Sequence, residues 1–146
     1  MEKRTIHEKL QGIQSSLKAP KGQTNKFGGY TYRSAEDILT AVKPLLTKYG
    51  VTLVISDDIV GVEGRVYVKA TAVLAESESD YSIQVQGFAR EAESRKGMDD
   101  SQITGSASSY ARKYALNGLF AIDDTKDADA TNDHGKKTQA KSDFDF

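Results

Sequence analysis

Three segments in which apolar and polar residues alternate constrain the fold of this chain more than any other feature. They cover residues 51–56, 65–74 and 81–90, and polar connections near residues 61–64 and 77–80 separate them. Alternation with a period of two places apolar side chains on one face of a β-strand, and short polar connections join neighbouring strands as hairpins. The sequence therefore predicts a three-stranded antiparallel meander with one apolar face and one polar, partly basic face.

Two helices are expected before the meander. Capping boxes open both of them, at residues 5–8 and 34–37. Apolar residues at helical spacing follow each box, and they predict a first helix over residues 5–18 and a second that Gly50 terminates. Pro44 lies inside the second helix and either kinks it or splits it in two.

A long helix is expected after the meander, and it contains the stretch GSASSYARKYALNGLF, residues 105–120. We expect it to span residues 101–117, with Gly118 as its left-handed cap. Its small residues predict the close approach of another backbone. Tyr110 and Tyr114 fall on the side of the helix that is predicted to pack on the sheet.

The cationic pair Arg112 and Lys113 faces away from that side. It either solubilises the outer face of the helix or contacts a phosphate chain or a neighbouring protomer, and spacing alone does not decide between these roles. Leu116 lies on the same outer side, which argues against a wholly solvated face.

Length and charge complete the outline. The chain has 146 residues and no cysteine, which supports one domain and excludes disulfides and thiolate-ligated metals. Beyond residue 120 there are 4 Lys and 7 Asp, and the 16 basic and 14 acidic residues before that point leave a body of charge +2. We expect one α+β domain over residues 1–129 and a disordered acidic tail over residues 130–146. No stretch approaches the roughly 20 apolar residues of a membrane span, so we expect a soluble, cytoplasmic protein.

Several segments resemble a known family. SAEDILTAVKPLL, GMDDSQITGSASSYARKYALNGLF and AIDDTKDAD, together with the meander, are similar to the ERF (essential recombination function) family of phage-type single-strand annealing proteins. The resemblance covers residues 6–129. It implies a phage- or prophage-encoded protein of the bacterial cytoplasm that binds single-stranded DNA, anneals complementary strands without ATP and assembles into rings or filaments. It also implies a distant similarity to eukaryotic Rad-type annealing proteins, whose core is a β-hairpin or meander packed on a long helix.

The residues themselves fit this chemistry. The sequence has no Gly-rich phosphate loop with Lys and Ser or Thr, so ATP-driven strand invasion is not expected. Residues 21–33, KGQTNKFGGYTYR, are predicted to be a flexible loop, which either binds DNA or is an ordinary exposed loop with its tyrosines packed on the domain. Several protomers side by side would join such modest cationic patches into one track. The candidate DNA-binding residues are Lys21, Lys26, Tyr30, Tyr32, Arg33, Arg65, Lys69, Arg90, Arg112 and Lys113.

Two other function classes remain open. A coating protein would bind and protect single-stranded DNA without pairing it, although the sequence has no five-strand barrel pattern of the OB type. A metal-dependent nuclease would use the carboxylates of Asp123, Asp124, Asp127 and Asp129, but the EF-hand pattern fails there and a polar run after the helix is the alternative. We expect no enzyme activity, no cofactor and no resident metal.

The C-terminal end combines acidic and aromatic residues. Asp143, Phe144, Asp145 and Phe146 resemble the tail tip of bacterial single-strand-binding proteins. The resemblance implies a terminal Phe that enters an apolar pocket and carboxylates that meet basic residues of partner proteins. The tip is predicted to recruit host replication or repair proteins or to fold back over the DNA groove, and a merely solubilising end is the alternative.

Overall fold

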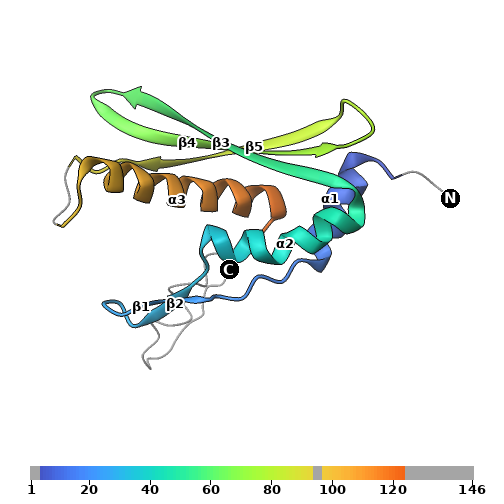
Figure 1. Ribbon diagram of the computed structural model, residues 1–146, viewed down its shortest axis with the longest axis horizontal. Helices are drawn as coiled ribbons and strands as arrows, with labels where there is room; N and C mark the ends of the chain where they lie inside the picture. Colours follow the sequence, from blue (N-terminus) through green and yellow to red (C-terminus); the bar gives the residue numbers. More distant parts are fainter. Residues whose placement is uncertain (1–3, 94–96, 124–146) are drawn as a thin grey trace, which may run out of the picture.

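The computed structural model describes residues 4–93 and 97–123 as one α+β unit, a sheet backed by helices (Figure 1). In chain order the elements are α1 (Ile6–Ser16), β1 (Gln23–Asn25), β2 (Tyr30–Tyr32), α2 (Ala35–Tyr49), β3 (Val51–Val62), β4 (Arg65–Glu76), β5 (Ser82–Arg90) and α3 (Asp100–Phe120). All three helices lie on one side of the sheet formed by β3, β4 and β5, and no described element covers the opposite face. The predicted order of two helices, a meander and a long helix is confirmed.

The large sheet is an antiparallel meander in the order β3-β4-β5. β3 is longer than the alternation predicted, because it stays paired with β4 through Asp57 and Asp58 as far as Val62. The backbone ladder continues there although the side-chain pattern breaks, since the partner strand supplies the hydrogen bonds. A two-residue turn closes the hairpin, with φ of 51° at Glu63 and 81° at Gly64, which suits the twist of the strands.

Close packing of α3 on the sheet depends on small residues. Gly87 of β5 faces α3, and a Cβ atom at this position would overlap the backbone of Ala111 and Ala115. Both alanines are fully buried, and so are Ala70 and Ala72 of β4 on the same face of the sheet. The predicted close approach of another backbone to this helix is therefore confirmed.

The prediction that Tyr110 and Tyr114 pack on the sheet is wrong. Their exposed fractions are 49% and 48%, and they lie beside the edge strand β5, where they line a pocket with Phe88 and Arg90. The physical reason is the short distance between helix and sheet, which leaves room for Cβ atoms but not for rings. Alanines therefore occupy the sheet side, and the tyrosines are displaced to the flank of the helix.

The end of α3 also differs from the prediction. Gly118 does not cap the helix; the helix continues to Phe120, and Ala121 takes the left-handed conformation with φ of 56°. Leu116, predicted on the outer side, is fully buried because α1 and α2 cover this part of α3. The Gln14 side chain of α1 donates a hydrogen bond of 2.9 Å to the carbonyl of Leu119. Tertiary contacts thus extend the helix beyond the local stop signal.

The first two helices begin where the capping boxes predicted. Thr5 and Ser34 are the N-cap residues, and both boxes are complete. α1 ends at Ser16, two residues before the predicted end. α2 is one continuous helix with Pro44 inside it, so the proline does not split it. Gly50 ends α2 in the left-handed conformation with φ of 69°, as predicted.

The flexible loop predicted for residues 21–33 is instead a small β-hairpin. β1 pairs with β2 in antiparallel register, from Gln23 opposite Tyr32 to Asn25 opposite Tyr30. We call residues 21–33 the arm. In Figure 1 it extends from the start of α2, on the side of α3 that faces away from the large sheet. The prediction missed the hairpin because its strands are only three residues long, too short for an alternating pattern to stand out.

Candidate nucleic-acid interface

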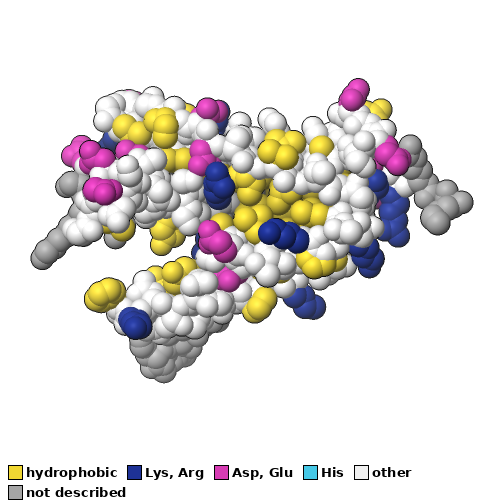
Figure 2. Space-filling view, in the orientation of Figure 1, with side chains coloured by type: hydrophobic (Ala, Val, Ile, Leu, Met, Phe, Trp, Pro, Cys, Tyr) yellow, Lys and Arg dark blue, Asp and Glu magenta, His cyan; other side chains and the backbone are white. Residues whose placement is uncertain are grey.

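The arm carries cations without acidic neighbours in the sequence. Between Glu8 and Glu36 there is no Asp or Glu. The same stretch contains the cations Lys9, Lys18, Lys21, Lys26 and Arg33. In Figure 2 the molecule is hollowed between the arm and the body above it. Because each phosphate of a nucleic acid is negative, an acid-free cationic projection suits a polyanionic ligand.

A carboxylate at the start of α2 holds the base of the arm. Asp37 accepts hydrogen bonds from the Gly22 backbone N–H at 3.3 Å, from the Gln23 side chain at 3.4 Å and from the Ser34 backbone N–H at 2.9 Å. Burial raises the pKa of the Asp37 carboxyl, but the hydrogen bonds from Ser34, Gly22 and Gln23 together outweigh it, so this pKa lies below 3.8. At neutral pH the ionised carboxylate joins the arm to the helix.

The tip of the arm is a defined turn that presents one aromatic residue. The Asn25 side-chain oxygen accepts from the backbone N–H groups of Phe27 and Gly28 at 2.9 and 3.0 Å, and the Gly29 N–H donates to the Asn25 carbonyl at 2.8 Å. The Asn25 amide also donates to the Tyr30 hydroxyl at 3.0 Å. Phe27 is 103% exposed, so its ring has no neighbour within the described chain. Asn25 thus fixes the backbone from which this ring projects.

The two tyrosines of the arm face inward rather than outward. Tyr30 and Tyr32 are half-buried, and their rings meet edge to face with centroids 6.1 Å apart. The ammonium of Lys113 lies 5.6 Å from the centroid of the Tyr32 ring, and Lys113 itself is buried, with 8% of its surface exposed. A cation over an aromatic face is attractive, most strongly where water is excluded. Lys113 therefore joins α3 to the arm.

Arg112 points to the other flank of α3, toward the edge strand β3. Its guanidinium donates to both carboxylate oxygens of Asp57, at 3.2 and 3.3 Å, and the Ser108 hydroxyl donates to the same carboxylate. The Arg112 side chain is 39% exposed. The positive charge of Arg112 is therefore paired with the carboxylate of Asp57. Arg112 can contact a phosphate only next to this carboxylate or after the ion pair breaks.

The remaining predicted cations lie on the open face of the sheet. Lys69 and Arg90 share this face, because the residues that alternate with them face the helices. Asp58 stands opposite Lys69 in the register of β3 and β4, and Phe88 stands opposite it in β5. Arg65, at the start of β4, points to the same side. These three cations are separated from the arm by the sheet and by α3 (Figure 1), so the arm and the open sheet face are two separate surfaces.

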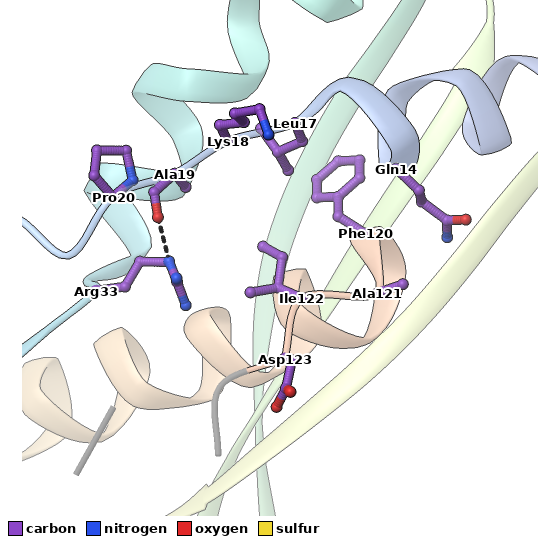
Figure 3. Close-up of a pocket in the computed structure, with 10 residues that line it drawn as sticks. All are labelled: Gln14, Leu17, Lys18, Ala19, Pro20, Arg33, Phe120, Ala121, Ile122 and Asp123. Atoms are coloured by element: carbon purple, nitrogen blue, oxygen red, sulfur yellow. Dashed lines mark hydrogen bonds between the residues drawn. The ribbon is translucent and has the colours of Figure 1, made fainter. Parts of the chain in front are cut away.

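Arg33 lines a pocket at the base of the arm (Figure 3). The pocket has a volume of about 530 Å³ and lies between the ends of α1 and α3, with apolar walls that include Leu17, Phe120 and Ile122. The Arg33 guanidinium donates to the Ala19 carbonyl, as the dashed line in Figure 3 shows. Arg33 therefore braces the segment that leads from α1 into the arm.

Several predicted residues lie outside the described part of the chain. These are Asp124, Asp127 and Asp129 of the carboxylate cluster and the tail tip, residues 143–146. The helices within residues 4–93 and 97–123 include none that is long and apolar enough to span a membrane.

The fold and the arm together define a class of protein. It is an α+β protein in which helices cover one face of an antiparallel meander, and its arm carries cations and aromatic residues that suit a polyanionic ligand. Comparison with known proteins identifies the family of the chain. The model of the ERF superfamily matches residues 6–144, nearly the whole chain, and the chain belongs to this superfamily.

One curated relative is the essential recombination function protein of Salmonella phage P22. The two are 54% identical over 135 residues, which is 92% of this chain and 63% of the relative. The chain thus spans less than two thirds of the length of the protein that it matches. No solved structure matches the chain.

Three residues that the fold makes important carry little signal in the sequence: Phe27, Asp57 and Asp37. Phe27 was not among the candidates, because an aromatic residue in a loop carries no sequence signal for exposure. Asp57 and Asp37 were not recognised as partners of Arg112 and of the arm, since both contacts join elements that are distant along the chain. An asparagine two residues before Phe27 was the available signal for an ordered turn.

Proposed function

We propose that this chain binds single-stranded DNA and anneals complementary strands without ATP, as part of phage-type homologous recombination. Membership of the ERF superfamily and the name of the P22 relative support a role in recombination. The observation that carries the DNA-binding part is the arm, which projects from the core with an exposed lysine, Lys26, two half-buried cations, no acids and an aromatic tip. The proposal includes no bond-breaking activity and no cofactor.

Annealing requires that phosphates are held while base edges stay free to meet a complement. Lys21 and Lys26 of the arm are placed to contact the backbone of one strand, and the hollow beside the arm leaves room for its bases (Figure 2). Contacts through phosphates carry no sequence preference, as annealing of arbitrary sequences demands. The cations of the open sheet face, Arg65, Lys69 and Arg90, form a second surface for a phosphate backbone.

Assembly into a ring or filament is part of this proposal. The body of the chain has a charge of only +2, too small for strong DNA binding by one copy. Copies side by side would align their arms into a continuous cationic track, and contacts along one strand would then reinforce one another. In this proposal the protein acts in the cytoplasm of the bacterial host, and its tail tip recruits host replication or repair proteins.

The decisive experiment is annealing of two complementary labelled oligonucleotides, one of them coated with protein first, followed by fluorescence without ATP or magnesium. Pairing faster than in the protein-free control supports the proposal. Binding without faster pairing would instead identify a coating protein. A parallel incubation with magnesium or manganese, followed by gel analysis of labelled DNA, tests the nuclease alternative, which intact DNA would eliminate.

The tail tip has its own test. Deletion of residues 143–146 should leave annealing of naked oligonucleotides unchanged and remove the interaction with host replication or repair proteins in a pull-down. Unchanged partners together with unchanged DNA affinity would leave the tip without a binding role.

A further inference from the structure

We propose that Phe27 is the residue of the arm that stacks on a DNA base, whereas Tyr30 and Tyr32 hold the arm in place. This inference rests on the proposed function, because it assumes that the chain binds single-stranded DNA. Aromatic side chains commonly stack on the bases of a single strand, and they do so without sequence preference, since every base has a π-face. The aromatic residue in question must present a free ring face.

Only one ring of the arm meets this condition within the described chain. Phe27 is 103% exposed, so both faces of its ring are open to a base. The Tyr32 ring lies under the Lys113 ammonium, and the Tyr30 ring packs against Tyr32 while its hydroxyl accepts from Asn25. Both tyrosines are half-buried and already in contact with other residues of the protein, whereas Phe27 is fully exposed.

The turn prepares Phe27 for this role. Asn25 fixes the backbone N–H groups of Phe27 and Gly28, and Gly29 takes a left-handed φ of 68° that glycine adopts without strain. Gly28 is required for a different reason: a Cβ atom at this position would overlap the Tyr30 ring. A stacking residue on such a fixed turn loses less conformational freedom on binding than one on a mobile loop.

Charge favours DNA over a second copy of this chain as the ligand of Phe27. The pocket beside β5, about 400 Å³ in volume and lined by Phe88, Tyr110 and Tyr114, is aromatic enough to receive a ring. The charged residue in its lining is Arg90, and no carboxylate lines it among the described residues. Phe27 arrives with Lys26 beside it, so like charges would meet in that pocket. A single strand offers both a ring to stack on and a phosphate for the lysine.

The test uses three substitutions at position 27 in the full chain. Phe27→Ala removes the ring, Phe27→Leu keeps an apolar side chain without a π-face, and Phe27→Trp keeps stacking. Because the chain has no tryptophan, Phe27→Trp also supplies a single fluorescent reporter. With oligo(dT), we expect Phe27→Ala and Phe27→Leu to weaken binding about 5- to 150-fold, the range that a stacked base contributes. Phe27→Trp should bind like the unaltered chain, and its emission should be quenched on binding.

Three results would overturn the inference. If the unaltered chain binds oligo(dT) and Phe27→Ala binds equally well, Phe27 does not stack. If Phe27→Leu retains full affinity, or if Phe27→Ala changes the size of the assembly in analytical ultracentrifugation, Phe27 contacts protein rather than a base. If the unaltered chain does not bind oligo(dT), the proposed DNA-binding function is wrong, and this result is obtained without the variants. Since Phe27 is fully exposed among residues 4–93 and 97–123, thermal unfolding of all three variants should match that of the unaltered chain.

Discussion

The arm and the three-stranded sheet are both antiparallel β-structure, but different forces hold them in place. In the large sheet, long ladders carry an apolar face that α3 buries. The arm has three residue pairs, and a few polar and aromatic contacts connect it to the core, chiefly those of Asp37 and Lys113. We infer that the sheet and its helices contribute most of the free energy of unfolding, and that the arm makes the contacts with the ligand.

The largest expected effect is at the contact between sheet and helix. Gly87→Ala should lower the free energy of unfolding by about 3 kcal/mol, since its Cβ atom would overlap the backbone of α3 and force the layers apart. The matched control is Gly61→Ala in β3, where the new Cβ atom meets nothing within 4 Å. Urea unfolding of both variants checks the difference. Equal midpoints would mean that α3 does not pack as closely as described.

A smaller effect is expected where α3 meets the arm. Lys113→Ala should lower the free energy of unfolding by about 1–2 kcal/mol, because it removes a largely buried cation from the Tyr32 ring. It should also weaken DNA binding by loosening the arm. The control is Lys26→Ala at the exposed tip, which should change binding alone. If Lys113→Ala lowers affinity but not thermal stability, Lys113 contacts DNA directly, as the sequence suggested.

The stabilising contribution of Asp37, which holds the base of the arm, should depend on pH. The pKa of Asp37 is lower in the folded chain than its ordinary value, so its stabilising contribution is complete above the ordinary value and is lost as pH falls through the folded one. Asp37→Asn should therefore lose about 1 kcal/mol at pH 7 and show a flatter decline of melting temperature below pH 4. Glu36→Gln, at an exposed neighbouring position, should keep the original pH profile. Identical profiles for both variants would refute this role of Asp37.

The smallest expected effect concerns single cations of the arm. Lys26→Ala should weaken binding to single-stranded DNA a few-fold and reduce the slope of log affinity against log salt by about 0.7, the value for one lost phosphate contact. Unfolding should not change. Lys43→Ala, at an exposed position of α2, is the control. An equal loss in both variants would indicate binding by overall charge rather than by the arm.

The sequence by itself determined the elements whose signals are local. Both N-terminal capping boxes, the order of the strands and the left-handed glycine at the end of α2 follow from residues close together in the chain. A hydroxyl that caps its own helix, or an alternation along one strand, needs no partner from elsewhere in the chain. For the same reason the long helix and its close contact with another backbone were predictable from its small residues.

Only the tertiary structure decided which side chains meet across elements. Because Gly87 has no side chain, the sheet packs so close to α3 that Tyr110 and Tyr114 lie on the flank of the helix. The residue pattern within the helix does not indicate this distance between helix and sheet. Lys113 is buried and lies beside the Tyr32 ring of the arm, whereas its neighbour Arg112 pairs with an acid on β3. Burial and pairing are properties of two or more segments together. A single segment of sequence therefore shows which residues carry charge and rings, and the fold determines which of them remain open to a ligand.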